Sequence, residues 1–215
     1  MKKVLIAFTT NSGSTEEVAQ VVGEELTKNG AQIVVRRIEE VTSVEGYDAV
    51  VVGAPMIVGW HRSALKFIKK HQPALRNMQV AYFFTSMNLT QTDEKQIGTV
   101  SILVDPDLAK PPKKEKRLSF KERYATPASY LNPALKAAPE VKPVSVGFFG
   151  GKLELFRLKL LQMLFVMVVI QAQPGDMRNW TFIREWAATI SAEFLKDAST
   201  QFGEVKDGKN PRRIS

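Results

Sequence analysis

The sequence predicts an α/β fold in which a doubly wound parallel sheet carries helices on both faces. Three apolar runs of strand length, at 4–8, 47–53 and 79–84, indicate strands that are buried on both sides. Helical stretches and short connections alternate with these runs, as in βαβ units. A turn rich in hydroxyl side chains follows the first run, at the edge where such sheets bind ligands.

The elements follow one another in the order βαββαβ along roughly the first 90 residues. Apolar residues at helical spacing predict a helix over 15–29, which Asn29-Gly30 ends. Ser63 is expected to cap a second helix that runs to about Lys70. We expect five strands and a last helix, at 4–8, 32–37, 47–53, 79–84 and 144–149, and from 179 to about 195.

The turn at Thr9–Thr15 indicates a small phosphate site. Hydroxyl and amide side chains fill most of it, and a helix N-terminus behind it adds roughly half a positive charge. The turn has no Lys or Arg and lacks the spacing of a P-loop or of a dinucleotide fingerprint, so neutral donors would hold the anion. The alternative is an ordinary βα turn in which a Ser or Thr caps the helix.

Two further loops are expected beside this turn, because right-handed crossovers bring the ends of parallel strands to one edge. They are the loop at Pro55–Trp60, after the third strand, and the loop at Thr85–Leu89, after the fourth strand. The predicted ligand site therefore lies where the three loops meet.

A proline-rich insert at 90–142 interrupts the alternation of strands and helices. Loops of this length inside a compact domain are usually functional or disordered. Within the insert, Phe120–Ala138 is expected to form helix broken near Pro127 and Pro133. The insert leaves from the third loop and returns into the fifth strand, so we expect it to cover part of the ligand. The domain is expected to span 1–200, with a polar tail at 201–215.

The stretch Leu160–Ile170 is apolar apart from Gln162. It is too short to span a bilayer, which takes about 20 apolar residues. Two interpretations remain: a helix packed on the sheet, or a helix whose outer face contacts a membrane or a partner.

Composition narrows the classes of chemistry. The chain of 215 residues has no cysteine, which excludes disulfides, thiolate metal sites and cysteine nucleophiles. The histidines, His61 and His71, have no carboxylate cluster between them, so no metal site is expected. The N-terminus lacks a signal-peptide pattern, which favours a cytoplasmic protein.

Positive charge is concentrated in the second half of the chain. Residues 1–100 carry a net +1 of the total +8, and much of the rest lies in Lys110–Arg117 and in the tail. Nucleic acid is not expected as a partner, because the basic insert lacks interleaved aromatic residues for stacking on bases. With Leu160–Ile170, the Lys110–Arg117 cluster suggests peripheral contact with an anionic membrane at the cytoplasmic face.

The motifs also resemble a known family. Ser12-Gly13-Ser14-Thr15 after a strand is similar to the phosphate loop of flavodoxins, and Gly53-Ala54-Pro55 with Gly59 resembles the second flavin loop of the wider flavodoxin-like superfamily. More specific is the series of Thr85-Ser86-Met87-Asn88-Leu89-Thr90, a long insert, Val146–Leu153, and Asn179-Trp180 at the last helix. This series resembles the flavodoxin-type, quinone-dependent protoporphyrinogen oxidases and covers nearly the whole chain.

The resemblance implies a flavodoxin-like sheet of strand order 2-1-3-4-5 and FMN as cofactor. It implies an oxidoreductase that passes electrons from a reduced substrate through FMN to a quinone, as in heme biosynthesis; the alternative is a non-enzymatic electron carrier that docks on protein partners. No side chain is assigned as catalytic, because the flavin carries the chemistry. The implied FMN-binding residues are Thr10, Asn11, Ser12, Gly13, Ser14, Thr15, Ala54, Pro55, Met56, Ile57, Val58, Gly59, Trp60, Thr85, Ser86, Met87, Asn88 and Leu89.

The three tryptophans are expected to differ in role. Trp60 either lies against the flavin ring or is a rim aromatic of the loop. Trp180 and Trp186 are expected to anchor the last helix in the core.

Overall fold

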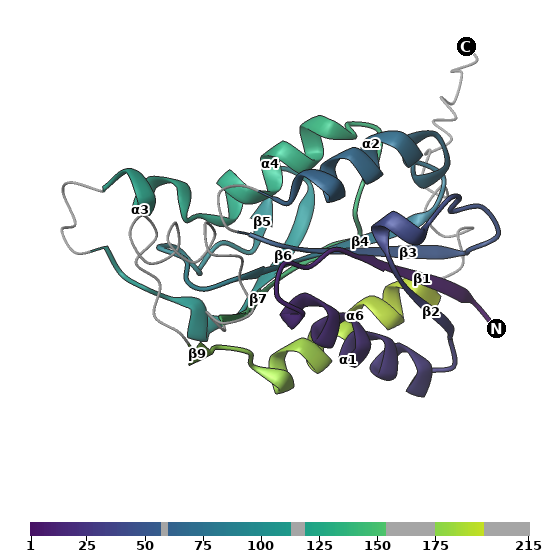
Figure 1. The fold of residues 1–215 in the computed structure, drawn as a ribbon, viewed down its shortest axis with the longest axis horizontal. Coiled ribbons are helices and arrows are strands. Elements are labelled where there is room, and N and C mark those ends of the chain that lie inside the picture. Colours follow the sequence, from purple (N-terminus) through teal and green to yellow (C-terminus); the bar gives the residue numbers. More distant parts are fainter. Residues whose placement is uncertain (57–59, 113–118, 154–174, 196–215) are drawn as a thin grey trace, which may run out of the picture.

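A computed structural model describes residues 1–56, 60–112, 119–153 and 175–195. Its main sheet has seven strands in the order β2-β1-β3-β4-β7-β6-β5, and helices cover both faces (Figure 1). The five predicted strands are β1, β2, β3, β4 and β7, and their order is the predicted 2-1-3-4-5, so the fold class is confirmed. The predicted number of strands is wrong, because two more join the sheet beyond β7. The strands are β1 Lys3–Phe8, β2 Gln32–Arg37, β3 Ala49–Pro55, β4 Gln79–Ser86, β5 Gln96–Ile97, β6 Val100–Val104 and β7 Ser145–Gly150.

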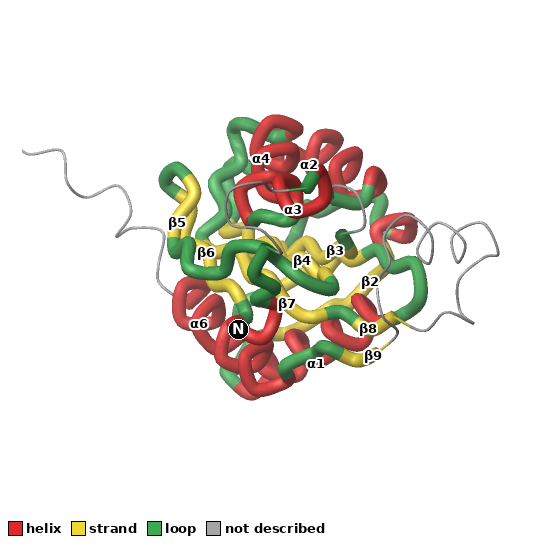
Figure 2. The backbone as a smooth tube through the Cα atoms, turned by 90° about the vertical axis from the view of Figure 1, so that its left-hand side faces the viewer, coloured by secondary structure: helices red, strands yellow, loops and turns green. Residues whose placement is uncertain are grey.

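Each face of the sheet packs against its own pair of helices. The helices α1 (Ser14–Lys28) and α6 (Trp180–Leu195) cover one face, and α2 (Arg62–Leu75) and α4 (Pro127–Ala137) cover the other (Figure 2). Because successive side chains of a strand point to opposite faces, β1 contributes Val4 and Ile6 to one core and Leu5 to the other. Strands β1, β3, β4 and β7 are therefore almost wholly buried, as continuous apolar runs predict.

The limits of α2 differ from the prediction. The helix begins at Arg62 and continues past Lys70 through Pro73 to Leu75. Its N-cap is His61 rather than Ser63: the His61 Nδ1 accepts a hydrogen bond from the Ser63 N–H at 3.3 Å. The buried residues Ala64, Phe67, Ile68, His71 and Leu75 form the face that holds the extra turn on the sheet.

The insert is part of the core, and whether it also covers part of the ligand stays a prediction. It supplies β5 and β6, the short 3-10 helix η2 (Pro106–Leu108), α3 (Phe120–Tyr124) and α4. Strand β6 pairs in parallel with β7, and Ile102, Leu131 and Ala134 are buried. The predicted break near Pro127 is present, because α4 starts there with a Thr126 N-cap. The predicted break at Pro133 is wrong, since that residue lies inside α4.

Both tryptophans of the last helix pack as predicted. Trp186 is fully buried, and its Nε1 donates to the Ser145 Oγ of β7 at 3.0 Å. Trp180 is partly buried against the same core. Beside them, β8 (Lys152–Leu153) pairs with β9 (Gly175–Asp176) in a small antiparallel ribbon.

Several predicted features lie outside the described residues. They are Ile57, Val58 and Gly59 of the second loop, Lys113–Arg117, Leu160–Ile170 and the tail at 201–215. Within the described part of the chain, no helix has both the length and the apolar character needed to cross a membrane.

Candidate functional site

The three predicted loops meet and are hydrogen-bonded to one another at the carboxyl edge of the sheet. The N–H of Thr9 donates to the Gly53 carbonyl at 3.0 Å, and the N–H of Met56 donates to the Thr85 carbonyl at 2.8 Å. The hydroxyls of Thr15 and Thr85, both buried, share a hydrogen bond at 3.0 Å between their Oγ1 atoms. The expectation that the loops converge is therefore confirmed.

The turn after β1 is shaped by Gly13 rather than by a Ser or Thr cap. Gly13 is the N-cap of α1, with φ +94°, and no side chain makes a capping hydrogen bond there. Its own N–H donates to the Thr10 Oγ1 at 2.9 Å, which folds the turn back on itself. The interpretation as a capped βα turn is therefore wrong. In the described part of the chain, the N–H groups of Asn11 and Ser14 have no hydrogen-bond acceptor, so this helix N-terminus retains donors for an anion.

Two carboxylates in the first turn of α1 are neutralised by arginines. Glu16 pairs with Arg37 of β2 at 3.0 Å, and Glu17 pairs with Arg178 at 2.6 Å. Without these partners the two charges would oppose an anion at the same helix end, because each lies within the first turn. The arrangement therefore leaves the positive end of the helix dipole available.

In the loop after β3, the side chain of Trp60 is buried rather than exposed to solvent. The backbones of Met56 and Trp60 form an isolated bridge that brackets the predicted residues Ile57, Val58 and Gly59. The Trp60 ring is 3% exposed and packs 5.3 Å from the Tyr82 ring and 4.8 Å from the Phe84 ring, between ring centroids. The interpretation as an exposed rim aromatic is therefore wrong.

Two buried polar atoms at this edge lack a partner among the described residues: the Nε1 of Trp60 and the Oγ of Ser86. Ser86 follows Phe84 by two positions on β4, so its side chain shares the sheet face that Trp60 packs on. Buried donors without partners are uncommon, and they are typical of places where a ligand or water completes the hydrogen bonds.

The loop after β4 is hydrogen-bonded to the insert. The Leu89 N–H donates to the Leu108 carbonyl and the Lys110 N–H donates to the Leu89 carbonyl, both at 2.8 Å. Leu89 is fully buried in the core. The backbone of this loop is therefore held in place, while Ser86, Met87 and Asn88 precede the anchor point.

A fourth loop, which the sequence did not indicate, borders the site. The Gly151 N–H donates to the Ser86 carbonyl at 2.7 Å, so the end of β7 lies against the end of β4. Gly150 is needed because a Cβ there would lie 1.7 Å from the Met177 carbonyl oxygen. The pair Gly150-Gly151 directly after an apolar strand was the signal available in the sequence.

A buried carboxylate joins the insert to the last helix. Asp105 is fully buried, and its Oδ1 accepts from the Asp107 N–H at 3.0 Å. Burial raises the pKa of Asp105, against the opposing effect of hydrogen bonds from neighbouring N–H groups. Asn179 donates from Nδ2 to the Asp107 Oδ2 at 3.0 Å and accepts the Phe182 N–H at 3.1 Å, capping α6. The run Asp105-Pro106-Asp107 after a strand was the only sequence hint of this link.

The His61 cap makes α2 sensitive to pH. Burial lowers the pKa of His61, and nearby Glu39 partly opposes this shift. Protonation of Nδ1 removes the acceptor for the Ser63 N–H. A folded-state pKa below the unfolded value means that the cap stabilises the fold above about pH 6.5 and that this stability is lost as pH falls through the folded pKa.

We therefore expect His61→Ala to lower the free energy of unfolding by about 1 kcal/mol at pH 8, the usual contribution of a cap. The difference from wild type should shrink as the pH falls below about 6. Chemical denaturation across pH measures both effects. His61→Asn is the control, because it keeps a neutral capping acceptor and should retain stability without the pH dependence. A constant difference between wild type and His61→Ala at all pH values would contradict the assignment of the cap.

A family model and several known proteins are similar to this chain. A family model described as a flavodoxin domain matches residues 5–178. Among curated proteins, protoporphyrinogen IX dehydrogenase [quinone] of Escherichia coli (strain K12) is 42% identical over 91 residues, which are 40% of this chain and 49% of that protein. The chain thus spans about half the length of the curated relatives that it matches.

Solved flavodoxins align with most of the chain at low identity. Oxidised flavodoxin 1 from Bacillus cereus is 14% identical, with a TM-score of 0.48, and the alignment covers 90% of this chain and 97% of that chain. Flavodoxin from Fusobacterium nucleatum bound to flavin mononucleotide is 12% identical, with a TM-score of 0.48, covering 90% and 99%.

Proposed function

Because the chain belongs to the flavodoxin domain family, we propose that it is an FMN-dependent oxidoreductase that passes electrons from a reduced substrate to a quinone. The observation that carries the proposal is the uncapped N-terminus of α1, whose N–H groups at Asn11 and Ser14 have no acceptor among the described residues, where three loops are hydrogen-bonded together. The quinone and a porphyrinogen-like substrate are suggested by the Escherichia coli relative, which is matched over about half its length.

The residues at this edge fit FMN. The N–H groups and hydroxyls of the turn at Thr10–Thr15 would hold the phosphate, with α1 behind it. Residues of the two adjacent loops, at 54–60 and 85–89, would flank the ring system. The buried Nε1 of Trp60 and Oγ of Ser86 are donors that lack partners among the described residues and that a polar ring edge could satisfy.

The cofactor supplies the electron-transfer chemistry when it is bound. The chain supplies binding and orientation. Hydrogen bonds between Thr85 and both Thr15 and Met56 fix the loops relative to one another. This reduces the entropy cost of ordering the loops when the cofactor binds. The buried aromatic layer of Trp60, Tyr82 and Phe84 excludes water from one side of the edge.

The proposal predicts that FMN binds far more tightly than riboflavin. A phosphate held by several donors contributes about 1.5–3 kcal/mol for each charge-assisted hydrogen bond, so we expect a difference of at least about 100-fold in Kd. Gly13→Ala should weaken FMN and leave riboflavin almost unchanged, because alanine is strained at φ +94° and the turn would deform. Flavin fluorescence titration measures both ligands. Equal affinity for FMN and riboflavin would remove the phosphate assignment.

Turnover separates the enzyme from an electron carrier. An enzyme of this class oxidises protoporphyrinogen anaerobically with a menaquinone analogue as acceptor. A carrier instead exchanges single electrons rapidly with a flavin reductase and shows no turnover of a small substrate. Anaerobic assays of the FMN-loaded protein with both sets of reactants decide between the two.

Peripheral membrane contact remains part of the proposal. The Lys110–Arg117 cluster would contribute about 1 kcal/mol for each basic residue near an anionic surface, and Leu160–Ile170 would add apolar contact. Co-sedimentation with anionic and neutral vesicles, at low and high salt, tests this. Full recovery in the supernatant under all four conditions would remove membrane contact from the proposal.

A further inference from the structure

The solvent-facing side of α2 carries four cations and no anion. Arg62, Lys66, Lys69 and Lys70 are exposed, and the helix contains no Asp or Glu between Arg62 and Leu75. At 3.6 residues per turn these four positions fall within a sector of about 100° around the helix axis. We call this sector the cationic face of α2.

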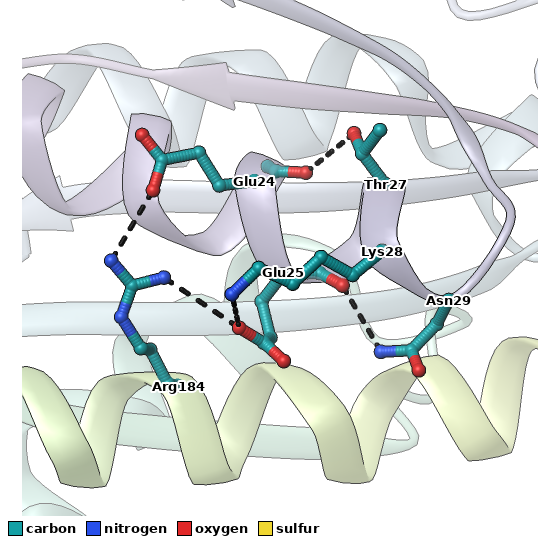
Figure 3. A network of polar contacts seen from close by, with 7 residues as sticks. Glu24, Glu25, Thr27, Lys28, Asn29 and Arg184 are labelled. Carbon is teal, nitrogen blue, oxygen red and sulfur yellow. Dashed lines mark hydrogen bonds and ion pairs between the residues drawn. The ribbon is translucent and has the colours of Figure 1, made fainter.

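None of these four side chains has an ion-pair or hydrogen-bond partner among the described residues. The 3-10 helix η1 (Ile38–Glu40) packs beside α2, but the carboxylates of Glu39 and Glu40 form no ion pair with them. The opposite side of the sheet differs: there, Arg184 of α6 bridges Glu24 and Glu25 of α1, at 3.3 and 3.6 Å (Figure 3). The cationic face of α2 is therefore a cluster of four cations on one helix face that have no ion-pair partners among the described residues.

This charge pattern does not stabilise the helix. Lys66 lies four residues from both Arg62 and Lys70, and like charges at that spacing destabilise a helix. Arg62 also stands at the positive end of the helix dipole, where an acidic residue would be favoured. Residues that break a local rule without a structural gain are expected at functional surfaces.

The face begins at the candidate site and offers only polar contact. Arg62 follows Trp60 by two residues, so the first cation lies at the loop edge. Phe67, Ile68 and Leu75 of α2 are buried in the core and Leu65 is partly buried against it, so α2 has no exposed large apolar side chain to insert into a bilayer. Small, polar, weakly bound interfaces that depend on charge are typical of electron-transfer encounters.

We propose that the cationic face of α2 docks the acidic surface patch of a protein that exchanges electrons with the bound flavin. This inference rests on the proposed redox function and names the class of partner. Charge attraction would steer the acidic protein toward the loop edge and raise its association rate by about 10- to 1,000-fold at low salt. In each encounter with a reduced one-electron donor, one electron passes to the flavin; two encounters and two protons from water complete the reduction.

The test uses an acidic [2Fe–2S] ferredoxin as the probe. K66E/K69E reverses two charges of the face, and K95E/K142E is the control, because Lys95 and Lys142 are exposed lysines outside α2. The two variants have equal net charge. Binding to labelled ferredoxin is measured by fluorescence anisotropy at about 0.05 M and about 0.5 M salt, where screening differs strongly. Reduction of the bound flavin by reduced ferredoxin is followed by stopped flow.

Wild type should bind ferredoxin at low salt and lose most of that affinity at high salt. K66E/K69E should lower both affinity and reduction rate at low salt by at least about 10-fold, while K95E/K142E changes them by less than about 3-fold. K66E/K69E should melt no lower than wild type, because the reversal at position 66 places opposite charges four residues from Arg62 and Lys70. A loss of binding therefore cannot be ascribed to unfolding.

Three outcomes would overturn the proposal: no salt-sensitive binding by wild type, an equal loss in both variants, or unchanged ferredoxin binding by K66E/K69E. If in the last case K66E/K69E no longer sediments with anionic vesicles, the face is a lipid surface instead. Two controls separate docking from the redox function. They are reduction of the bound flavin by dithionite, and ferredoxin binding by the protein without FMN. A chain that retains no FMN but still binds ferredoxin through α2 would contradict the proposed function and leave the docking face standing.

Discussion

Gly150→Ala is expected to be among the most damaging single changes near the site. A Cβ at this position would lie 1.7 Å from the Met177 carbonyl oxygen and 2.4 Å from its carbon. These are backbone atoms, and the Met177 N–H is itself held by the Gly151 carbonyl at 3.0 Å, so the segment has little freedom to move away. We expect a loss of about 3 kcal/mol, at the upper end of the range for overpacked positions, and a fall in Tm of about 6–12 °C.

Gly151→Ala is the matched control. Its added Cβ would meet nothing closer than the Ser86 carbonyl oxygen at 3.4 Å, which is ordinary contact, and its N–H would still reach that oxygen. We expect a change below about 1 kcal/mol. Thermal melts of the two variants compare them directly. If both glycines prove equally tolerant of alanine, the close approach of the segment before α6 to the end of β7 is incorrect.

The parts of the fold that sequence predicted are those encoded locally. Continuous apolar runs mark the central strands because both of their faces are buried, and Asn29-Gly30 marks the end of α1 because Gly30 adopts φ +87°. The convergence of the loops also followed, since right-handed crossovers leave parallel strand ends on one edge. The predicted turn at Thr9–Thr15 lies at that edge.

The features that were missed depend on partners distant in sequence. Strands β5 and β6 are short, and β6 is identified by its pairing with β7 rather than by its own pattern. Trp60 is buried because Tyr82 and Phe84 form a surface for it, which no spacing in the loop reveals. His61 caps α2 through a ring nitrogen, an acceptor outside the usual set of capping residues.

Arg178 joins the last helix to the helix that would hold the phosphate. Its side chain is 4% exposed, and it donates to the Glu17 Oε2 at 2.6 Å and to both carboxylate oxygens of Asp176 at 2.6 and 2.7 Å. Its guanidinium also lies 4.5 Å from the Trp180 ring centroid. Hydrogen bonding to Arg178 holds the pKa of Asp176 below its usual range. The contact thus connects the first turn of α1, the ribbon of β8 and β9, and the start of α6.

Arg178→Met is expected to lower the free energy of unfolding by about 2 kcal/mol, because it removes a buried cation and leaves two carboxylates without it. Arg184→Met is the control, since Arg184 also bridges two carboxylates, those of Glu24 and Glu25 of α1 (Figure 3), but its side chain is 38% exposed. Its loss should be below about 1 kcal/mol. Urea denaturation at pH 7 measures both.

The stability of Arg178→Met at low pH and its affinity for FMN test the same contact in two further ways. Because the folded-state pKa of Asp176 is lowered, its contribution is present above its unfolded pKa of about 3.9 and is lost as pH falls through the folded value. The stability difference between wild type and Arg178→Met should therefore narrow below about pH 4.

Arg178→Met also leaves Glu17 unpaired in the first turn of α1, where a negative charge opposes a bound phosphate. We expect weaker FMN binding in Arg178→Met than in Arg184→Met, with riboflavin unaffected in both. Equal FMN affinities would show that the Glu17 charge is too distant or too well screened to reach the ligand.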